Sequence, residues 1–433
     1  MNAKQSQLIE IFNAFKPEAL RDDDLLRYYQ STAMGRGDYE LEQHDTLFNR
    51  IVHSPSTARL LIVGHLGCGK STELHMLVNK LSNELDNYQP IIIETKERLN
   101  PGSFTYIDLL ILIVNILIEH IDEKNIDLDE SLIDAIEEAL STKKLEENKT
   151  RGVKGQATAE FGLKAKFASI LRGSASVSAS MSAGSELSRE LRREYEPKMK
   201  EILDALNVLI RDVERQQGKE VVLIIDGLEK YRQESVLKLF TEDINAIVGI
   251  GAHLVMACPI AVLRSSGAYN LNIHFAPPTI MPMISTQNPD GTPNELGVSI
   301  VKDLVAKRTS IENFEDGVLE KIIAYAGGSL RDTCLLVSES AFAAFERNRE
   351  AVDMESLKSV VNKLDYLYFL RIEEKYYETV KRIYKGDTEP RHNPDYFELM
   401  YAGTVLEYNH EKWVNLHPLV RRYIDNHPRC LGD

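Results

Sequence analysis

The stretch ARLLIVGHLGCGKSTELHMLVNKL, Ala58–Leu81, decides the fold of this chain. It opens with a short apolar run, turns through glycines and continues with apolar residues at helical spacing, which predicts a strand, a loop and a helix. The loop has the pattern G-x-x-x-x-G-K-[ST] from Gly64 to Ser71. Glycines in such a loop let backbone N–H groups face a phosphate, and the start of the helix adds partial positive charge. The stretch therefore predicts a phosphate-binding loop.

The residues of this loop have separate predicted roles. We expect the Lys70 ammonium to reach the β- and γ-phosphates of ATP and the Ser71 hydroxyl to bind Mg²⁺, so that ATP and Mg²⁺ are the predicted cofactors. The predicted nucleotide-binding residues are Gly64, Gly67, Cys68, Gly69, Lys70, Ser71 and Thr72.

A second apolar run, EVVLIIDGLEKY, supplies a predicted metal-binding acid. Its five apolar residues, 221–225, end at Asp226, as in a buried parallel strand. Asp226 at the carboxyl end of that strand is placed to hold the Mg²⁺ water shell together with Ser71. For the carboxylate that activates the attacking water, we favour Glu229 over Glu94, which ends the strand PIIIE. A solvated surface acid remains the alternative interpretation of either residue.

With both motifs in place, the sequence resembles the additional-strand P-loop ATPases of the AAA+ and STAND groups over about residues 45–347. The segment IIAYAGGSLRDTCLLV is similar to the AAA+ lid motif that carries a sensor arginine. This resemblance implies that Arg331 contacts the γ-phosphate. The two motifs and this resemblance together give the predicted catalytic residues Lys70, Asp226, Glu229 and Arg331.

The sequence departs from the AAA+ pattern at the end of the strand GAHLVMACPI. Residues 257–259 are Ala, Cys and Pro, where such families usually carry Asn, Thr or Ser. The difference implies slow hydrolysis. Arg264 and Arg308 are candidates for an arginine that acts on a neighbouring subunit. Upstream, residues 34–52 resemble the segment that wraps the adenine in such ATPases.

The predicted fold class is α/β, with a three-layer parallel-sheet P-loop core, an inserted β-hairpin, a helical lid and a C-terminal winged helix. The predicted domains are a core over 1–284, a lid over 285–364 and a winged helix over 365–433. The predicted core strands are 59–63, 90–94, 221–225, 253–258 and 278–284. In the tail, two short strands separated by an Asn409-His410 turn form the predicted wing, and His417 beside Pro418 is predicted to be a turn residue.

The inserted hairpin is predicted within 150–185, where apolar residues alternate with Lys, Arg, Ser and Gly. Strands over 155–170 and 173–183 would put the apolar residues on one face. Residues 149–173 hold six cations and one acid. We favour a surface that docks on another subunit; contact with nucleic acid, or insertion into a membrane or a target protein, remains open.

Composition limits the class of protein. The chain of 433 residues has 51 Lys plus Arg against 66 Asp plus Glu, a net charge of -15, which argues against a surface devoted to nucleic acid. The four cysteines lack paired spacing and indicate free thiols in a reducing compartment. The run LLILIVNILI is too short to span a bilayer and predicts a buried helix.

Together these features predict a cytoplasmic, slowly hydrolysing ATPase that acts as an oligomeric switch or motor subunit. The resemblance implies a homo-oligomer with a separate effector protein, in bacterial antiviral defence. Nucleic acid is a possible partner that we do not favour, and no stable membrane insertion is expected. Two alternatives stay open: a DNA-associated AAA+ ATPase of the initiator or transposition-regulator type, and a nucleotide-gated scaffold that does not hydrolyse ATP.

Overall fold

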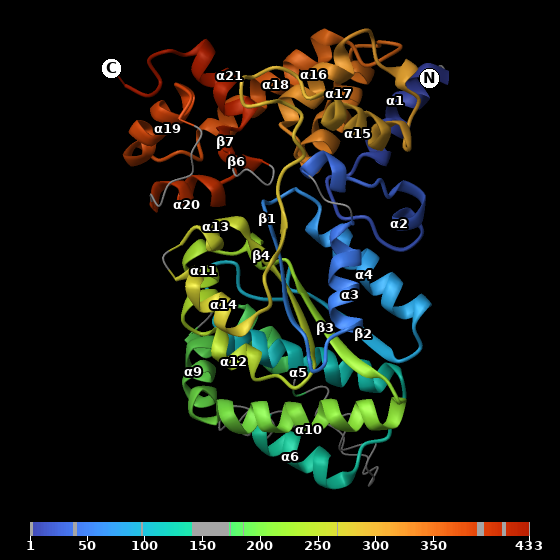
Figure 1. Cartoon of the computed structure of the whole chain (residues 1–433), viewed down its shortest axis with the longest axis vertical. Helices are drawn as coiled ribbons and strands as arrows, with labels where there is room; N and C mark the ends of the chain where they lie inside the picture. The colour runs from blue at the N-terminus through green and yellow to red at the C-terminus, as the bar shows by residue number, and fades with distance from the viewer. Residues whose placement is uncertain are drawn as a thin grey trace, which may run out of the picture.

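The computed structural model describes all residues except 1–2, 38–40, 97, 141–172, 174, 185, 266, 388–393, 409–412 and 433. Figure 1 shows a parallel sheet with helices on both faces, and a second, largely helical part beyond the carboxyl ends of the strands. The P-loop lies between these two parts because it follows the carboxyl end of strand β1 (Arg59–Gly64).

The sheet has five parallel strands in the order β2-β3-β4-β1-β5. Their bounds are Arg59–Gly64 (β1), Tyr88–Glu94 (β2), Glu220–Asp226 (β3), His253–Pro259 (β4) and Thr279–Met281 (β5). The predicted α/β fold with a parallel P-loop core is confirmed. Strand β4 lies between β1 and β3, which is the additional strand that the sequence resemblance implied.

The strands are apolar along their length because both faces of the sheet are covered. Side chains of Leu61, Leu223 and Ile225 contribute to one buried cluster, shared with α5 (Tyr106–Glu123) and α10 (Met199–Gln217). Their neighbours Ile62 and Ile224 contribute to the cluster on the opposite face, shared with α3 (Gln43–Val52) and α4 (Lys70–Glu84). The alternation follows from the two-residue period of a strand.

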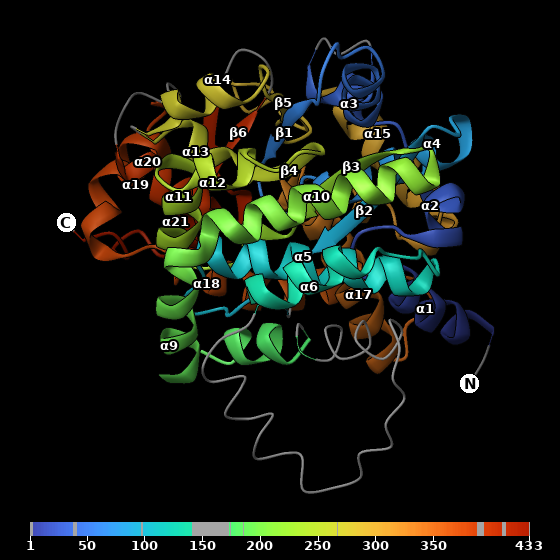
Figure 2. The same ribbon diagram turned by 90° about the horizontal axis from the view of Figure 1, so that it is seen from below.

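The helices of the core surround this sheet. Their bounds are α2 Asp22–Tyr28, α3 Gln43–Val52, α4 Lys70–Glu84, α6 Glu130–Leu140, α9 Glu186–Tyr195, α11 Gln233–Thr241, α12 Ile244–Val248, α13 Ile260–Leu263 and α14 Leu271–His274. Figure 2 shows α5, α6 and α10 running beside one another on one side of the sheet. Short 3-10 helices include η1 (Ala33–Arg36) before α3 and η3 (Leu228–Lys230) after β3.

Helix α5 carries the predicted run LLILIVNILI, and the prediction of a buried helix is confirmed. Its residues 109–114 are at most 4% exposed. Thr105 and Asp108 form a capping box at its start, and Asp108 also binds Arg192 at 2.9 Å. Within the described part of the chain, none of the helices combines the length and the hydropathy that a membrane span requires.

The predicted second strand of the inserted hairpin, 173–183, is wrong. Residues 175–182 are helical, and Val177 and Met181 bury their side chains in the cluster around α5. These two residues are four positions apart and therefore lie on one face of a helix. The predicted first strand, 155–170, lies outside the described residues, as do the cations of the hairpin that the sequence singled out.

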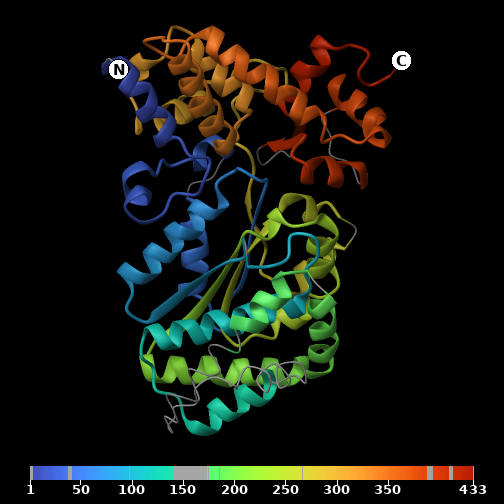
Figure 3. The same cartoon turned by 180° about the vertical axis from the view of Figure 1, so that it is seen from behind.

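Beyond the sheet, a third buried cluster joins the predicted lid, the tail and the first helix. The helices are α1 Ala3–Ala14, α15 Glu295–Ala306, α16 Val318–Ala326, α17 Leu330–Glu346, α18 Met354–Phe369, α19 Tyr377–Tyr384, α20 Pro394–Tyr401 and α21 Pro418–Asn426. Helix α1 packs on α17, where the Ser338 hydroxyl donates to the Phe12 carbonyl at 3.0 Å. Figure 3 shows α1 beside these lid helices and the tail on their other side.

The tail contains the predicted pair of short strands. Strands β6 (Val405–Tyr408) and β7 (Trp413–Leu416) pair in antiparallel register, and the predicted turn between them lies outside the described residues. His417 lies directly before α21 and its Nδ1 accepts from the Leu419 N–H at 3.2 Å. Assignment of the tail as a winged helix, like the division into three domains, stays a prediction.

Candidate functional site

The loop between β1 and α4 has the backbone shape that its glycines permit. Gly67 has φ +84° and Gly69 has φ +106°, which is the left-handed region that side chains disfavour. A Cβ on Gly64 would lie 2.5 Å from the Met281 carbonyl oxygen on β5, so only glycine fits at this position. Helix α4 begins at Lys70 directly after the loop.

Lys70 turns its side chain back along the loop. It is 3% exposed, and its ammonium donates to the carbonyls of Gly64 at 3.0 Å and His65 at 2.8 Å. Burial acts to lower the pKa of Lys70, but nearby acidic groups, among them Glu229 and Asp226, hold the pKa above its usual value. Lys70 is therefore a buried cation next to two carboxylates.

Asp226 ends β3 and stands opposite Glu94 of β2 in the parallel register. Its carbonyl accepts from the N–H of Thr95 at 3.0 Å and from the hydroxyl of Thr95 at 2.9 Å. Gly227 follows with φ +90°, which lets the chain turn sharply after the acid. The Asp226 side chain is buried, and among the described residues its Oδ1 has no hydrogen-bond partner. Buried polar atoms in proteins usually have a partner, so this oxygen is available to a hydrogen-bond donor or a cation that binds in the cavity.

Ser71 and Asp226 line the same cavity, and both fit a bound Mg²⁺. Across the described ranges, no group of three or more His, Cys, Asp or Glu is arranged to hold a metal. Mg²⁺ is often held by one or two protein ligands, with waters and phosphate oxygens completing the shell. The unpartnered Asp226 oxygen and the neighbouring hydroxyl suit that mode of binding.

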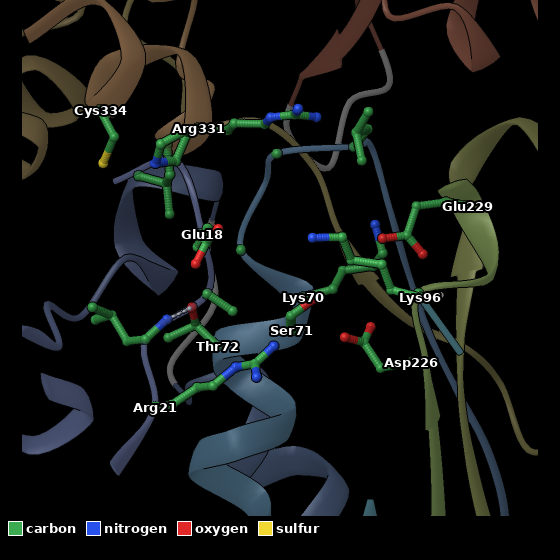
Figure 4. Close-up of a pocket in the computed structure, with 18 of the residues that line it drawn as sticks. Glu18, Arg21, Lys70, Ser71, Thr72, Lys96, Asp226, Glu229, Arg331 and Cys334 are labelled. Carbon is green, nitrogen blue, oxygen red and sulfur yellow. Dashed lines mark hydrogen bonds between the residues drawn. The ribbon is translucent and has the colours of Figure 1, made fainter. Parts of the chain in front are cut away.

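The two candidates for activating water differ in their contacts. Glu94 forms an ion pair with Arg21 at 2.8 Å, and the His75 ring lies 3.3 Å from its other carboxylate oxygen. Glu229 lies in the short helix η3, and its Oε2 is buried without a hydrogen-bond partner among the described residues. Figure 4 shows Lys70, Asp226 and Glu229 on one side of the cavity. Glu229 therefore has an oxygen that the described residues leave without a partner, and its role as the base stays a prediction.

The start of α17 lies directly on the loop. The Arg331 N–H donates to the Gly67 carbonyl at 3.2 Å, and Ser329 caps the helix by accepting from the Asp332 N–H. The preceding Gly328 has φ +80°, and a Cβ on it would lie 1.9 Å from the Ile284 carbonyl oxygen. The Gly-Gly-Ser sequence therefore allows this close approach. The Arg331 side chain is exposed and lines the cavity.

The cavity has a volume of about 560 Å³ and extends from the loop to the predicted lid. Its charged lining holds six cations and four acids: Arg21, Lys70, Lys96, Lys230, Arg308, Arg331, Glu18, Glu94, Asp226 and Glu229. This excess of cations occurs in a chain whose net charge is -15. The site is therefore suited to an anion rather than to a cationic ligand.

The predicted nucleotide-binding residues occupy different positions around this cavity. Gly67, Gly69, Lys70, Ser71 and Thr72 line it, and the Thr72 hydroxyl accepts from the Leu20 N–H at 3.3 Å, as drawn in Figure 4. Gly64 and Cys68 lie behind the lining. The Cys68 carbonyl accepts from Arg36 at 2.6 Å, and Arg36 is fully buried.

Sequence reasoning missed the N-terminal part of the lining. Residues 17–21 together with Tyr28 and Gln30 close one side of the cavity, ahead of the 34–52 segment that the sequence singled out. Within that segment Arg36 instead supports the loop from behind. These N-terminal residues carry no motif, so only the folded chain brings them to the site.

The two candidate arginines for a neighbouring subunit have partners within the chain. Arg264 forms a bidentate ion pair with Glu407, at 2.9 and 2.6 Å. Arg308 lines the cavity, donates to the Cys334 sulfur at 3.1 Å and lies over the Phe15 ring at 5.3 Å. In this conformation both arginines are engaged within the chain.

The parallel sheet and the loop give the chain the fold of the P-loop NTPases. Residues 43–250 match the profile of the KAP family P-loop domain. No curated protein matches the chain. The similar solved structures include Cdc6p from Pyrobaculum aerophilum, with 13% identity over 94% of this chain and 98% of that chain and a TM-score of 0.41. The ORC2 protein of Aeropyrum pernix in ADPNP–ADP complexes has 13% identity over 89% and 91%, with a TM-score of 0.39.

Proposed function

We propose that the protein binds ATP with Mg²⁺ and hydrolyses it slowly. The observation that carries this proposal is the meeting of a buried Lys70 with the unpartnered carboxylate oxygens of Asp226 and Glu229 in one cavity of a P-loop fold. The cationic lining and the size of the cavity suit a nucleoside triphosphate.

Each residue of the site has a separate role in the proposed reaction. The loop amides and Lys70 bind the phosphates, Ser71 and Asp226 hold Mg²⁺, and Glu229 accepts a proton from the attacking water. When bound, Mg²⁺ neutralises part of the charge on the β- and γ-phosphates. Arg331, at the start of α17 beside the loop, reports the presence of the terminal phosphate; its contact with the Gly67 carbonyl supports this role.

Slow turnover is part of the proposal because of the residues that end β4. Ala257, Cys258 and Pro259 offer no side-chain amide or hydroxyl beside the loop. Burial raises the pKa of the Cys258 thiol, which keeps it neutral. A polar group that orients the attacking water in many ATPases is thus absent from this strand.

The finer parts of the proposal rest on the sequence resemblance. They are an oligomeric switch or motor subunit with a separate effector, a setting in bacterial antiviral defence and a location in the cytoplasm. The winged-helix tail and the ranges 1–284, 285–364 and 365–433 as three domains belong to the same proposal.

Single-turnover release of phosphate tests the proposal. In the presence of Mg²⁺, wild-type protein in excess over radiolabelled ATP should release phosphate. The Lys70→Ala variant should not. ATP binding without phosphate release would overturn the hydrolytic part and leave the non-hydrolysing scaffold. Absence of ATP binding by the wild-type protein would overturn the proposal as a whole.

A further inference from the structure

One residue of the phosphate-binding loop faces away from the cavity. His65 is 2% exposed, and its Nε2 lies 2.8 Å from the backbone nitrogen of Glu407, in strand β6 of the tail. The amide can only donate, so Nε2 is the acceptor and the neutral ring carries its proton on Nδ1. A loop residue is thereby bound to a backbone position 342 residues further along the chain.

Glu407 is itself held firmly by the core. Its side chain is 3% exposed and takes two hydrogen bonds from Arg264, which follows α13 just beyond β4. Its carbonyl accepts from the Met283 N–H at 3.2 Å, just beyond β5. A bidentate arginine–carboxylate pair fixes geometry as well as charge, and truncation of Arg264 would leave the buried Glu407 charge without its partner.

The position of His65 bears on the lysine of the loop. The His65 carbonyl accepts from Lys70 at 2.8 Å, so the backbone of this residue contacts the phosphate-binding cation while its ring contacts the tail. The preceding Gly64 is the last residue of β1 and is held in the sheet between Pro259 of β4 and Met281 of β5. Movement of the ring is therefore passed to the loop rather than absorbed before it.

We propose that His65 is a positioning residue of the phosphate-binding loop, and that Glu407 and Arg264 hold it in place from the tail and the end of β4. The tail then sets the shape of the loop, and through it the affinity for nucleotide. This inference rests on the proposed function for its effect on ATP. Its effect on the loop itself is independent of ATP.

Variants of His65 separate positioning from simple support of the fold. His65→Gln keeps an acceptor at similar reach and should bind ATP within roughly threefold of the wild-type affinity. His65→Leu leaves the Glu407 N–H buried without an acceptor and should weaken ATP binding by about tenfold or more. Calorimetric titration of the full chain with ATP and Mg²⁺, well below the unfolding temperature of each variant, measures both values.

Arg264→Gln tests the same inference without a change in the loop, and serves if His65→Leu does not fold. Loss of the ion pair should weaken ATP binding by about fivefold or more. Arg232→Gln, at an exposed position outside the cavity, is the matched control and should bind as the wild type does.

Hydrogen exchange of the amides of residues 65–70 in nucleotide-free protein gives the second readout. Exchange should be faster in His65→Leu and Arg264→Gln than in the wild type and His65→Gln. Unchanged exchange would overturn the inference whatever the result with ATP. Equal ATP affinity of folded His65→Leu and wild type would overturn it as well, and would leave the proposed function standing. Failure of the wild type to bind ATP, with exchange altered as expected, would overturn only the proposed function.

Discussion

The Arg331 N–H donates to the Gly67 carbonyl at 3.2 Å, so the first turn of α17 and the phosphate-binding loop share a backbone hydrogen bond. A Cβ on Gly67 would lie 2.9 Å from both the Arg331 Cβ and the Ser329 Oγ. The predicted lid is therefore in contact with the loop along its main chain. A ligand that changes the loop has a direct route to α17.

Gly67→Ala is expected to disturb this contact. The new methyl group clashes with the start of α17 at a φ of +84°, and the free energy of unfolding should fall by about 1–3 kcal/mol. Gly218→Ala is the matched control, because Gly218 has φ +64° but nothing within 4 Å of its Cβ position. Thermal unfolding should show a loss in both variants, whereas only Gly67→Ala should also weaken ATP binding. Equal ATP affinity in both would contradict the importance of the contact.

Lys70→Ala should abolish stabilisation by ATP. At 100 times its Kd, ATP should raise the free energy of unfolding of the wild type by about 2.7 kcal/mol. The variant lacks the buried cation of the loop, so the increment should disappear in thermal unfolding with ATP and Mg²⁺. Lys321→Ala removes an exposed lysine from α16 and should keep the full increment. A retained increment in Lys70→Ala would show that ATP binds elsewhere.

Glu229→Gln should separate binding from hydrolysis. The amide cannot accept the proton of water, so turnover should fall by about 10²–10⁴-fold while ATP affinity changes little. Glu94→Gln should retain turnover within a few-fold, because Glu94 is already paired with Arg21. Single-turnover phosphate release compares the two. The reverse order of effects would assign the role to Glu94.

Arg331→Ala should reduce discrimination between ATP and ADP. A charge-assisted hydrogen bond contributes about 1.5–3 kcal/mol, so ATP affinity should fall by about tenfold or more, with ADP affinity less affected. Titration with each nucleotide measures the ratio. An equal loss for both nucleotides would place the arginine away from the terminal phosphate.

Acid should destabilise the fold through His65. Burial, followed by the nearby Lys70, lowers the pKa of His65 to about 3. The unfolded chain takes up the proton below about pH 6.5 and the folded chain does not, so stability is full above that pH and is lost as the pH falls toward 3. The charged and titratable groups around the ring are Lys70, Arg264, His417 and Glu407, and the Met400 backbone acts in the opposite sense by raising the pKa.

The measurement is the free energy of unfolding between pH 6.5 and 5. His65 alone accounts for a loss of up to about 1.4 kcal/mol per pH unit, and His65→Gln should lose correspondingly less than the wild type. His53→Gln, at an exposed position, should follow the wild type. Parallel curves for wild type and His65→Gln would contradict the buried neutral ring.

Local sequence predicted the features that depend on local chemistry. The loop glycines, the start of α4 at Lys70 and the strand that ends at Asp226 each follow from a short pattern, and all three occur as expected. The prediction of a strand over 173–183 was wrong because Val177 and Met181 are four residues apart. This spacing puts two side chains on one face of a strand and also on one face of a helix. Burial against α5, which a window of sequence does not contain, decides between the two.

The rest of the site depends on contacts between distant segments. The bond from Glu407 to His65, and the support of the Cys68 carbonyl by Arg36, join segments with no shared pattern. The same holds for the N-terminal residues that close the cavity. Their roles follow from tertiary packing, so composition and spacing carried no signal for them.

The pairing of α1 with α17 also bears on how the chain is made. The Phe12 carbonyl accepts its hydrogen bond from the Ser338 hydroxyl, which is synthesised 326 residues later. At about 5–20 residues per second, translation keeps α1 without its partner for about 16–65 s. During that interval Leu8, Ile11 and Phe15, at most 2% exposed in the finished fold, remain open to solvent or to chaperones. Helix α1 thus depends for its burial on a segment of the chain that is synthesised much later.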